Sequence, residues 1–205
     1  MQTYANLEII VIDDGSTDDS YLICEKYKKN DKRVKLFHKK NSGVSSARND
    51  GIKYSSGLYI MFLDSDDELD LNVIEILYND ITKTNADITN CNIKYISSNG
   101  IEQIKKLDTG VYNNEKALSV MLNSYVSPWG RLYKKIILDG IVFKTDIHIG
   151  EDLIFVAEAF IRSSKISFID FCGYKYYTNF ESATNSAFSA KKFEHITSRK
   201  YAKEL

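Results

Sequence analysis

Cysteine is scarce in this sequence, and it contains no long apolar run. Its three cysteines, Cys24, Cys91 and Cys172, are widely spaced and odd in number, which excludes a disulfide framework or a zinc site of closely spaced thiols. No apolar run approaches the ~20 residues that a membrane-spanning helix requires, and no signal peptide opens the chain. We therefore expect a cytoplasmic protein with reduced core thiols, and peripheral contact with the inner face of the cell membrane stays open.

Net charge is also small, because 27 Lys and Arg residues nearly balance 28 Asp and Glu residues. A net charge of −1 gives no general attraction to polyanions, so nucleic acid is not an expected partner. The basic pairs at 39–40 and 134–135 are typical of solvated faces. With 205 residues, 43% of them hydrophobic, the chain is long enough for one compact globular domain.

Apolar runs alternate with amphipathic segments along the chain, which predicts an α/β fold with a mainly parallel sheet flanked by helices. Strands are expected at residues 7–13, 34–37, 58–63, 129–133, 166–170 and 174–177, and the first and third of these read as buried. Helices are expected at residues 19–30, 47–55, 72–84, 113–123 and 152–163 and near the C-terminus. After residue 85 the pattern becomes mixed or antiparallel, with a hairpin around Asn99 and Gly100. Ser16 and Asp19 are expected to cap the first helix as a capping box.

Carboxylates follow two of the predicted strands directly. Asp13 and Asp14 end the first strand, and Asp64 and Asp66 follow the strand at 58–63. Open α/β folds bind their ligands at the carboxyl ends of such strands. A third acidic cluster, at residues 150–152, lies far along the chain, and we expect all three clusters to converge on one site.

The spacing of Asp64 and Asp66 indicates a metal ion. In extended chain, side chains two residues apart point the same way, and two carboxylates that project together suit Mg²⁺ or Mn²⁺. An acidic turn that caps the next helix would have the same sequence. The pair at 13–14 is likewise compatible with an ordinary turn, and residues 150–152 with a helix N-cap, so both readings stay open.

Four motifs in their order nevertheless resemble a known family. Asp-Asp-Gly-Ser-Thr-Asp at 13–18, the Gly/Ser segment at 41–49, Phe-Leu-Asp-Ser-Asp-Asp at 62–67 and Gly-Glu-Asp at 150–152 resemble family 2 glycosyltransferases. These are inverting enzymes of the GT-A fold that take sugars from nucleotide diphosphates. The segments Trp-Gly-Arg-Leu-Tyr and Tyr-Lys-Tyr-Tyr, later in the chain, also resemble bacterial members that build surface polysaccharides. The resemblance covers nearly all of residues 1–205, which we expect to form a single domain.

The resemblance implies a nucleotide-binding side of the site. Asp14, beside Asp13, would contact the nucleoside. Gly43 belongs to the Gly/Ser loop, and Arg48 behind it would lie near the nucleotide, where its guanidinium can steady the base or a phosphate. A surface cation on a helix is the alternative for Arg48. Asp64 would lie near the ribose.

The resemblance also implies a catalytic side. Asp64 and Asp66 match the family's Asp-x-Asp motif, with Asp66 as the direct ligand of Mg²⁺ or Mn²⁺. Asp152 matches the catalytic base, and Glu151 would support it. Trp129 could stack on an acceptor sugar or simply pack in the core. The polar segment at 179–186 would be a flexible loop over the site.

The implied activity is metal-dependent inverting transfer of a sugar from a nucleotide-diphosphate donor, expected to be a UDP-sugar, to a hydroxyl of a saccharide or lipid-linked acceptor. Two alternatives remain. One is a domain that binds nucleotide sugars as a scaffold without turnover. The other is a response-regulator receiver, whose first strand also ends in an acidic pair that binds Mg²⁺. A homo-oligomer stays open.

Family members ordinarily begin with a further strand and helix before the segment that resembles residues 2–4. We therefore expect a chain truncated at its N-terminus, and its last residues also stop within a helical pattern. The additional strand would lie between the strands at 7–13 and 58–63. Without it, both of those strands would have an unpaired edge.

Overall fold

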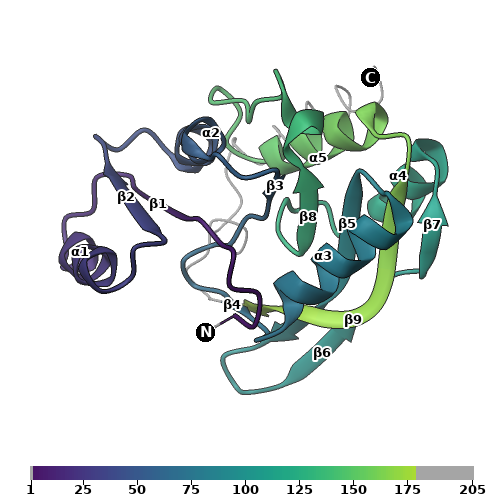
Figure 1. Cartoon of the computed structure of the whole chain (residues 1–205), viewed down its shortest axis with the longest axis horizontal. Coiled ribbons are helices and arrows are strands. Elements are labelled where there is room, and N and C mark those ends of the chain that lie inside the picture. The colour runs from purple at the N-terminus through teal and green to yellow at the C-terminus, as the bar shows by residue number, and fades with distance from the viewer. Residues whose placement is uncertain (1, 179–205) are drawn as a thin grey trace.

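The structure, a computed structural model, describes residues 2–178 (Figure 1). The expected C-terminal helix and the loop at 179–186 lie outside these residues. In order, the elements are β1 (Ile9–Asp13), α1 (Ser20–Asn30), β2 (Val34–His38), α2 (Val44–Tyr54), β3 (Tyr59–Ile60), β4 (Glu68–Leu69), α3 (Val73–Thr84), β5 (Ile88–Ile96), β6 (Glu102–Lys105), β7 (Gly110–Tyr112), α4 (Asn114–Leu122), β8 (Arg131–Lys134), the 3₁₀ helix η1 (Lys135–Leu138), α5 (Glu151–Arg162) and β9 (Ile166–Tyr177). Among residues 2–178, no helix is long and apolar enough to cross a membrane.

The strands form two sheets. β1 and β2 pair in parallel, and the larger sheet has the order β3-β8-β5-β9-β4, with β6 beside β5 and β7 beside β9. The expected α/β class and the mixed region after residue 85 are confirmed. Within residues 2–178, the larger sheet is mixed rather than mainly parallel, since only its β5–β9 pair is parallel and its other pairs are antiparallel. The turn around Asn99 and Gly100 joins β5 and β6 as an antiparallel hairpin, as predicted.

The core lies around the larger sheet. Helix α3 buries Val73, Leu77 and Ile81, which are spaced three to four residues apart along one face. Figure 1 shows this helix lying across β5 and β9. Most of α5 is buried, on more than one side, so this helix is held rigidly in the interior. The predicted bounds of α3, α4 and α5 agree with the structure to within one residue.

The first strand is less buried than its apolar sequence predicts. Within β1 only Asp13 is buried, and Ile9 is half-exposed. The buried strand predicted at 58–63 shortens to Tyr59–Ile60, and Leu58 is 81% exposed. The prediction of a buried strand is therefore wrong for β1, and at 58–63 it holds only for Ile60 and Phe62, which are buried in the core. Among the described residues, β1 pairs only with β2 and β3 only with β8, so each strand has one edge without a partner.

Two local predictions also need correction. Asp19 is the N-cap of α1 but makes no side-chain capping bond; instead the Ser20 amide donates to Asp18 at 3.0 Å. Ser16 donates to Asp13 rather than completing a capping box. The two strands predicted after residue 165 are one continuous strand, β9, whose register with β5 shifts next to Asn92.

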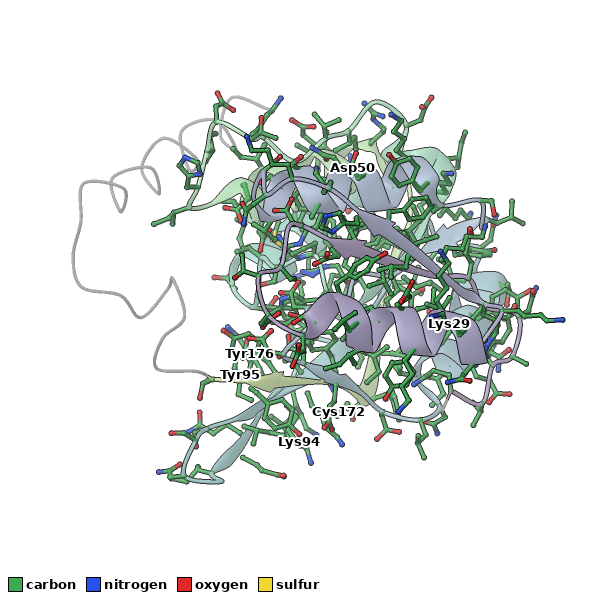
Figure 2. All side chains as sticks on the ribbon, turned by 90° about the vertical axis from the view of Figure 1, so that its left-hand side faces the viewer. Lys29, Asp50, Lys94, Tyr95, Cys172 and Tyr176 are labelled. Atoms are coloured by element: carbon green, nitrogen blue, oxygen red, sulfur yellow. The ribbon has the colours of Figure 1, made fainter. Side chains whose placement is uncertain are left out.

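The β1–β2 sheet and α1 form a separate lobe, which faces the viewer in Figure 2, where Lys29 marks α1 and Asp50 marks α2. Glu8, at the start of this lobe, accepts bonds from the Ser56 amide at 2.8 Å and the Ser56 hydroxyl at 2.9 Å, just before β3. The Lys35 ammonium lies 2.7 Å from the same carboxylate. Partial burial opposes ionisation, but these donors outweigh it and lower the pKa of Glu8 to about 2. Glu8 therefore ties the lobe to the larger sheet.

Replacement of Gly173 by Ala should destabilise the fold. A Cβ at this position of β9 would lie 2.2 Å from Cγ2 of Val73, which is completely buried in α3. We expect a loss of about 1–3 kcal/mol in the free energy of unfolding, measured by urea denaturation, because a filled core cannot accept an extra methyl group. Adding Val73→Ala should recover part of the loss. Gly51→Ala in α2, where the nearest atom is 4.0 Å away, should instead stabilise by roughly 0.5–1 kcal/mol; equal losses at both positions would contradict this packing.

Glu8→Gln should remove a pH-dependent part of the stability. A folded pKa of about 2, against 4.5 for the free side chain, means that ionised Glu8 stabilises the fold above pH 4.5 and that this contribution disappears as pH falls toward 2. Wild type should exceed the variant by about 1 kcal/mol at neutral pH, with the gap closing in acid. Denaturant melts between neutral pH and pH 2 measure the gap. Glu25→Gln, which breaks an exposed pair within α1, is the control and should show a smaller gap.

Candidate active site

The first acidic cluster fixes the loop that leads into α2. Asp14 accepts bonds from the amides of Ser42, at 3.0 Å, and Gly43, at 2.7 Å. Gly43 is the N-cap of α2 and has a φ of 88°, a conformation that favours glycine. In this structure the carboxylate of Asp14 thus holds the Gly/Ser loop, and its predicted contact with a nucleoside stays a prediction.

Asp13 lies beside this loop and is buried. It accepts bonds from the amide and hydroxyl of Ser16 and lies 2.5 Å from Nδ1 of His38. The bond from Ser16 is the largest influence and lowers the pKa of Asp13, and His38 acts in the same direction against the effect of burial. Asp13 is therefore held as a carboxylate at the end of β1.

Arg48 joins two of the acidic clusters. From α2, its Nη1 donates to Oδ1 of Asp152 at 2.6 Å, and its Nη2 donates to Oδ1 of Asp64 at 2.9 Å. Oε1 of Glu151 lies 4.0 Å from Nη1. Only 11% of the Arg48 side chain is exposed, so the alternative of a solvated surface cation is wrong. Burial acts against the charged guanidinium, but Asp152 and Asp64 outweigh it and raise the pKa of Arg48.

The guanidinium of Arg48 rests on a fixed aromatic support. It lies 5.3 Å from the ring centroid of Phe143, which stacks on Phe155 of α5 at 3.8 Å. Asn49, the next residue of α2, exchanges two bonds of 2.8 Å with the backbone of Phe143. The position of Arg48 is therefore determined by α2, by the loop at residue 143 and by α5 together.

Asp152 and Glu151 begin helix α5. Gly150, with a φ of 94°, precedes them in the left-handed region and turns the chain into the helix. Burial is the main influence on Asp152 and raises its pKa to about 7, although Arg48 opposes it. Burial likewise raises the pKa of Glu151. A carboxyl group that titrates near neutral pH is suited to general-base catalysis.

The Asp-x-Asp segment forms a turn and is not extended. The amide of Asp67 donates to the carbonyl of Asp64 at 3.2 Å, so the argument that Asp64 and Asp66 project the same way from a strand is wrong. Asp66 is exposed and has no hydrogen bond or ion pair with residues 2–178. Asp67 accepts from the Tyr174 hydroxyl at 2.6 Å and from the Tyr177 amide at 3.0 Å, while burial raises its pKa.

These residues fit a metal ion only in part. Within the described residues, no group of three or more His, Cys, Asp or Glu side chains is arranged to hold one, so the three clusters do not themselves enclose a common ion. Asp64 is already paired with Arg48, and Asp66 is available. One or two carboxylates completed by substrate phosphates are what Mg²⁺ commonly uses, and this donor set fits such a shared ion rather than a protein cage.

Trp129 is a core residue. It is buried, and its ring stacks on that of Tyr174 at 4.7 Å and on that of Tyr176 at 5.3 Å. Tyr176 in turn meets Tyr95 on the neighbouring strand at 5.4 Å (Figure 2). The packing role expected for Trp129 is confirmed, and Tyr174 connects this stack to Asp67 through its hydroxyl.

Sequence reasoning missed several contacts of the site. The sequence predicts a strand at 174–177, but no pattern in it indicates that Tyr174 holds Asp67. The carboxylates to which Arg48 binds could not be inferred either, because one lies 16 residues and the other 104 residues along the chain. A cleft of about 750 Å³ between α2, β3 and η1 adjoins this site at Asn49, but none of the predicted site residues lines it.

Comparison with known proteins agrees with this geometry. The model of Glycosyl transferase family 2 matches residues 1–196. Cholesterol galactosyltransferase of Borreliella burgdorferi is 33% identical over 196 residues, which cover 88% of this chain and 53% of that protein. Glycosyltransferase GlyA of Streptococcus pneumoniae is 33% identical over 190 residues, which cover 85% of this chain and 27% of that protein. The chain thus spans about half or less of the length of these two relatives.

Solved structures show the same fold. Staphylococcus aureus TarS with UDP-GlcNAc superposes with a TM-score of 0.81 at 23% identity, over 98% of this chain and 58% of TarS. A second crystal structure, of TarS residues 1–349, superposes with a TM-score of 0.73 at 26% identity, over 86% of this chain and 53% of that one. The expected GT-A fold is therefore confirmed. On the match over residues 1–196, the chain belongs to Glycosyl transferase family 2.

Proposed function

We propose that this protein transfers a sugar, with inversion, from a nucleotide-diphosphate donor to a hydroxyl group of a saccharide or lipid-linked acceptor, with the help of a divalent cation. The observation that carries the proposal is the pairing of Arg48 with both Asp64 and Asp152. It brings the acidic turn after β3 and the start of α5 to one place, although the sequence separates them widely. The receiver-domain alternative leaves this convergence unexplained.

The donor is expected to be a UDP-sugar. Membership of the family supports a nucleotide-sugar donor, and the structurally similar TarS was solved with UDP and with UDP-GlcNAc. The loop held by Asp14 leads into the N-terminus of α2, and the N-terminus of a helix favours anions. These features support binding of the nucleotide between β1 and α2.

Asp152 would act as the general base. Transfer requires removal of the proton from an acceptor hydroxyl as that oxygen attacks the sugar carbon. A carboxylate with a pKa of about 7 is basic enough to accept the proton and is still substantially ionised at neutral pH. Its place on α5, whose body is buried, holds it in a fixed position.

Asp66, with Asp64 beside it, would hold Mg²⁺ or Mn²⁺. Such an ion would offset the negative charge that develops on the diphosphate leaving group. Asp66 suits this role because it is exposed and unpaired among the described residues. Tyr174 and the Tyr177 amide would keep the turn in place through Asp67.

Asp152→Asn should abolish transfer and leave donor binding intact. The amide keeps the shape of the side chain but cannot take a proton, so kcat should fall roughly 10²–10⁴-fold. Transfer from a panel of nucleotide sugars measures kcat, and isothermal titration with UDP and Mn²⁺ measures binding. Asp108→Asn, at an exposed position outside the site, is the matched control. A parallel loss of binding would make Asp152 structural, and wild type that binds without turnover would favour the scaffold alternative.

Asp66→Asn should weaken the binding of the metal ion. A chelator should stop transfer by wild type, and Mn²⁺ or Mg²⁺ should restore it. In the variant, the Mn²⁺ concentration that gives half-maximal rate should rise roughly 10–100-fold, the loss that even a residue supporting a metal ligand can produce. Asp108→Asn should keep the wild-type metal curve. Full activity of wild type in the chelator would remove the ion from the mechanism.

A further inference from the structure

We propose that Arg48 is a positioning residue for Asp152: it fixes the orientation of this carboxylate against the acidic turn after β3 and thereby sets its basicity. The expected effect of Arg48 on kcat rests on the proposed function, whereas its effect on the orientation of Asp152 does not. This positioning role differs from the role in which Arg48 contacts only the nucleotide. In the structure the guanidinium is directed at the base itself.

The geometry of the guanidinium carries the inference. Its two terminal nitrogens bond to different carboxylates, Nη1 to Asp152 at 2.6 Å and Nη2 to Asp64 at 2.9 Å and 3.3 Å. Because the guanidinium is planar and its N–H groups have fixed directions, two such contacts determine the rotation of the group. Asp152 therefore accepts a hydrogen bond from a donor of fixed direction. A lysine ammonium on its flexible side chain could not hold Asp152 and Asp64 in this way at the same time.

The support beneath Arg48 is equally fixed. Phe143 lies under the guanidinium, is pinned to Asn49 by two hydrogen bonds and stacks on Phe155. Phe155 belongs to the same helix as Asp152, so Arg48 and the base rest on one packed unit.

The charges around Asp152 give Arg48 its effect on basicity. Glu151 on α5 and Asp64 after β3 both disfavour ionisation of Asp152, in the same direction as burial. Arg48 on α2 acts against them and lowers the pKa of Asp152. Arg48 also lowers the pKa of Glu151, and His148 acts on Glu151 in the same direction. Removal of the Arg48 charge should therefore raise the pKa of Asp152 and leave its carboxyl group protonated at neutral pH.

The first test reads this effect without any activity. Carboxyl ¹³C NMR of aspartate-labelled protein gives the titration midpoint of Asp152, assigned by its disappearance in Asp152→Asn. Arg48→Gln should move the midpoint upward, and Arg48→Lys should move it less, because the charge remains. Arg33→Gln, which breaks an exposed pair with Asp31, is the matched control and should leave the midpoint in place. An unchanged midpoint in Arg48→Gln would overturn the proposal.

The second test separates positioning from donor binding. If Arg48 positions the base, Arg48→Gln should lower kcat by on the order of 10²-fold, the cost of a misplaced catalytic group, with the donor KM close to wild type. The rise of kcat with pH should move to higher pH in the variant. A raised donor KM with unchanged kcat would instead make Arg48 a donor-binding residue and overturn the inference.

The two tests also distinguish failure of the inference from failure of the proposed function. Wild type that transfers no sugar from any donor would refute the function, while the NMR titration would still decide whether Arg48 controls Asp152. Circular dichroism checks that each variant is folded. If Arg48→Gln does not fold, both measurements are made on Arg48→Lys. An upward shift of the Asp152 titration midpoint together with a lower kcat supports positioning, and wild-type values for both overturn it.

Discussion

The partly buried pairing of one arginine with carboxylates from two distant segments is the constraint on which this site depends. Asp64, Glu151 and Asp152 lie close enough to influence one another, and without a cation their mutual repulsion and burial would favour protonation or separation. Arg48 offsets that repulsion, and the carboxylates around it in turn favour its charged form. Since a buried pair broken on one side leaves an uncompensated charge, α2, the turn after β3 and the start of α5 become structurally interdependent.

Helix α5 explains why the carboxyl group of Asp152 has a pKa near neutral pH. The N-terminus of a helix favours negative charge, and Glu151 and Asp152 occupy its first turn. The body of the same helix is apolar and buried, which takes Asp152 away from water and acts in the opposite direction. Burial prevails, so the carboxyl group titrates near neutral pH while the rigid helix keeps it in place.

Much of the fold follows from local pattern, whereas the contacts of the site do not. The spacing of Val73, Leu77 and Ile81 predicts α3, and the turn at residues 99–100 predicts the hairpin, because each depends on neighbours in sequence. The apolar run of β1 predicts more burial than the structure shows, because such a run does not reveal whether both edges and both faces of a strand have partners. The prediction that Asp64 and Asp66 project the same way assumes an extended chain. The chain turns here instead, with a backbone bond from Asp67 to Asp64 and a long-range pair between Asp64 and Arg48.

Helix α2 links the motifs that are separated along the chain. Asp14 holds the loop before this helix, Arg48 projects from its first half, and Asn49 fixes the support on which Arg48 lies. Helix α2 thus connects the side of the site nearest β1 with the side that carries Asp152, and each of the four motifs contributes one contact to that connection. Motifs that seem independent in sequence act as one structure because a single helix and a single guanidinium join them.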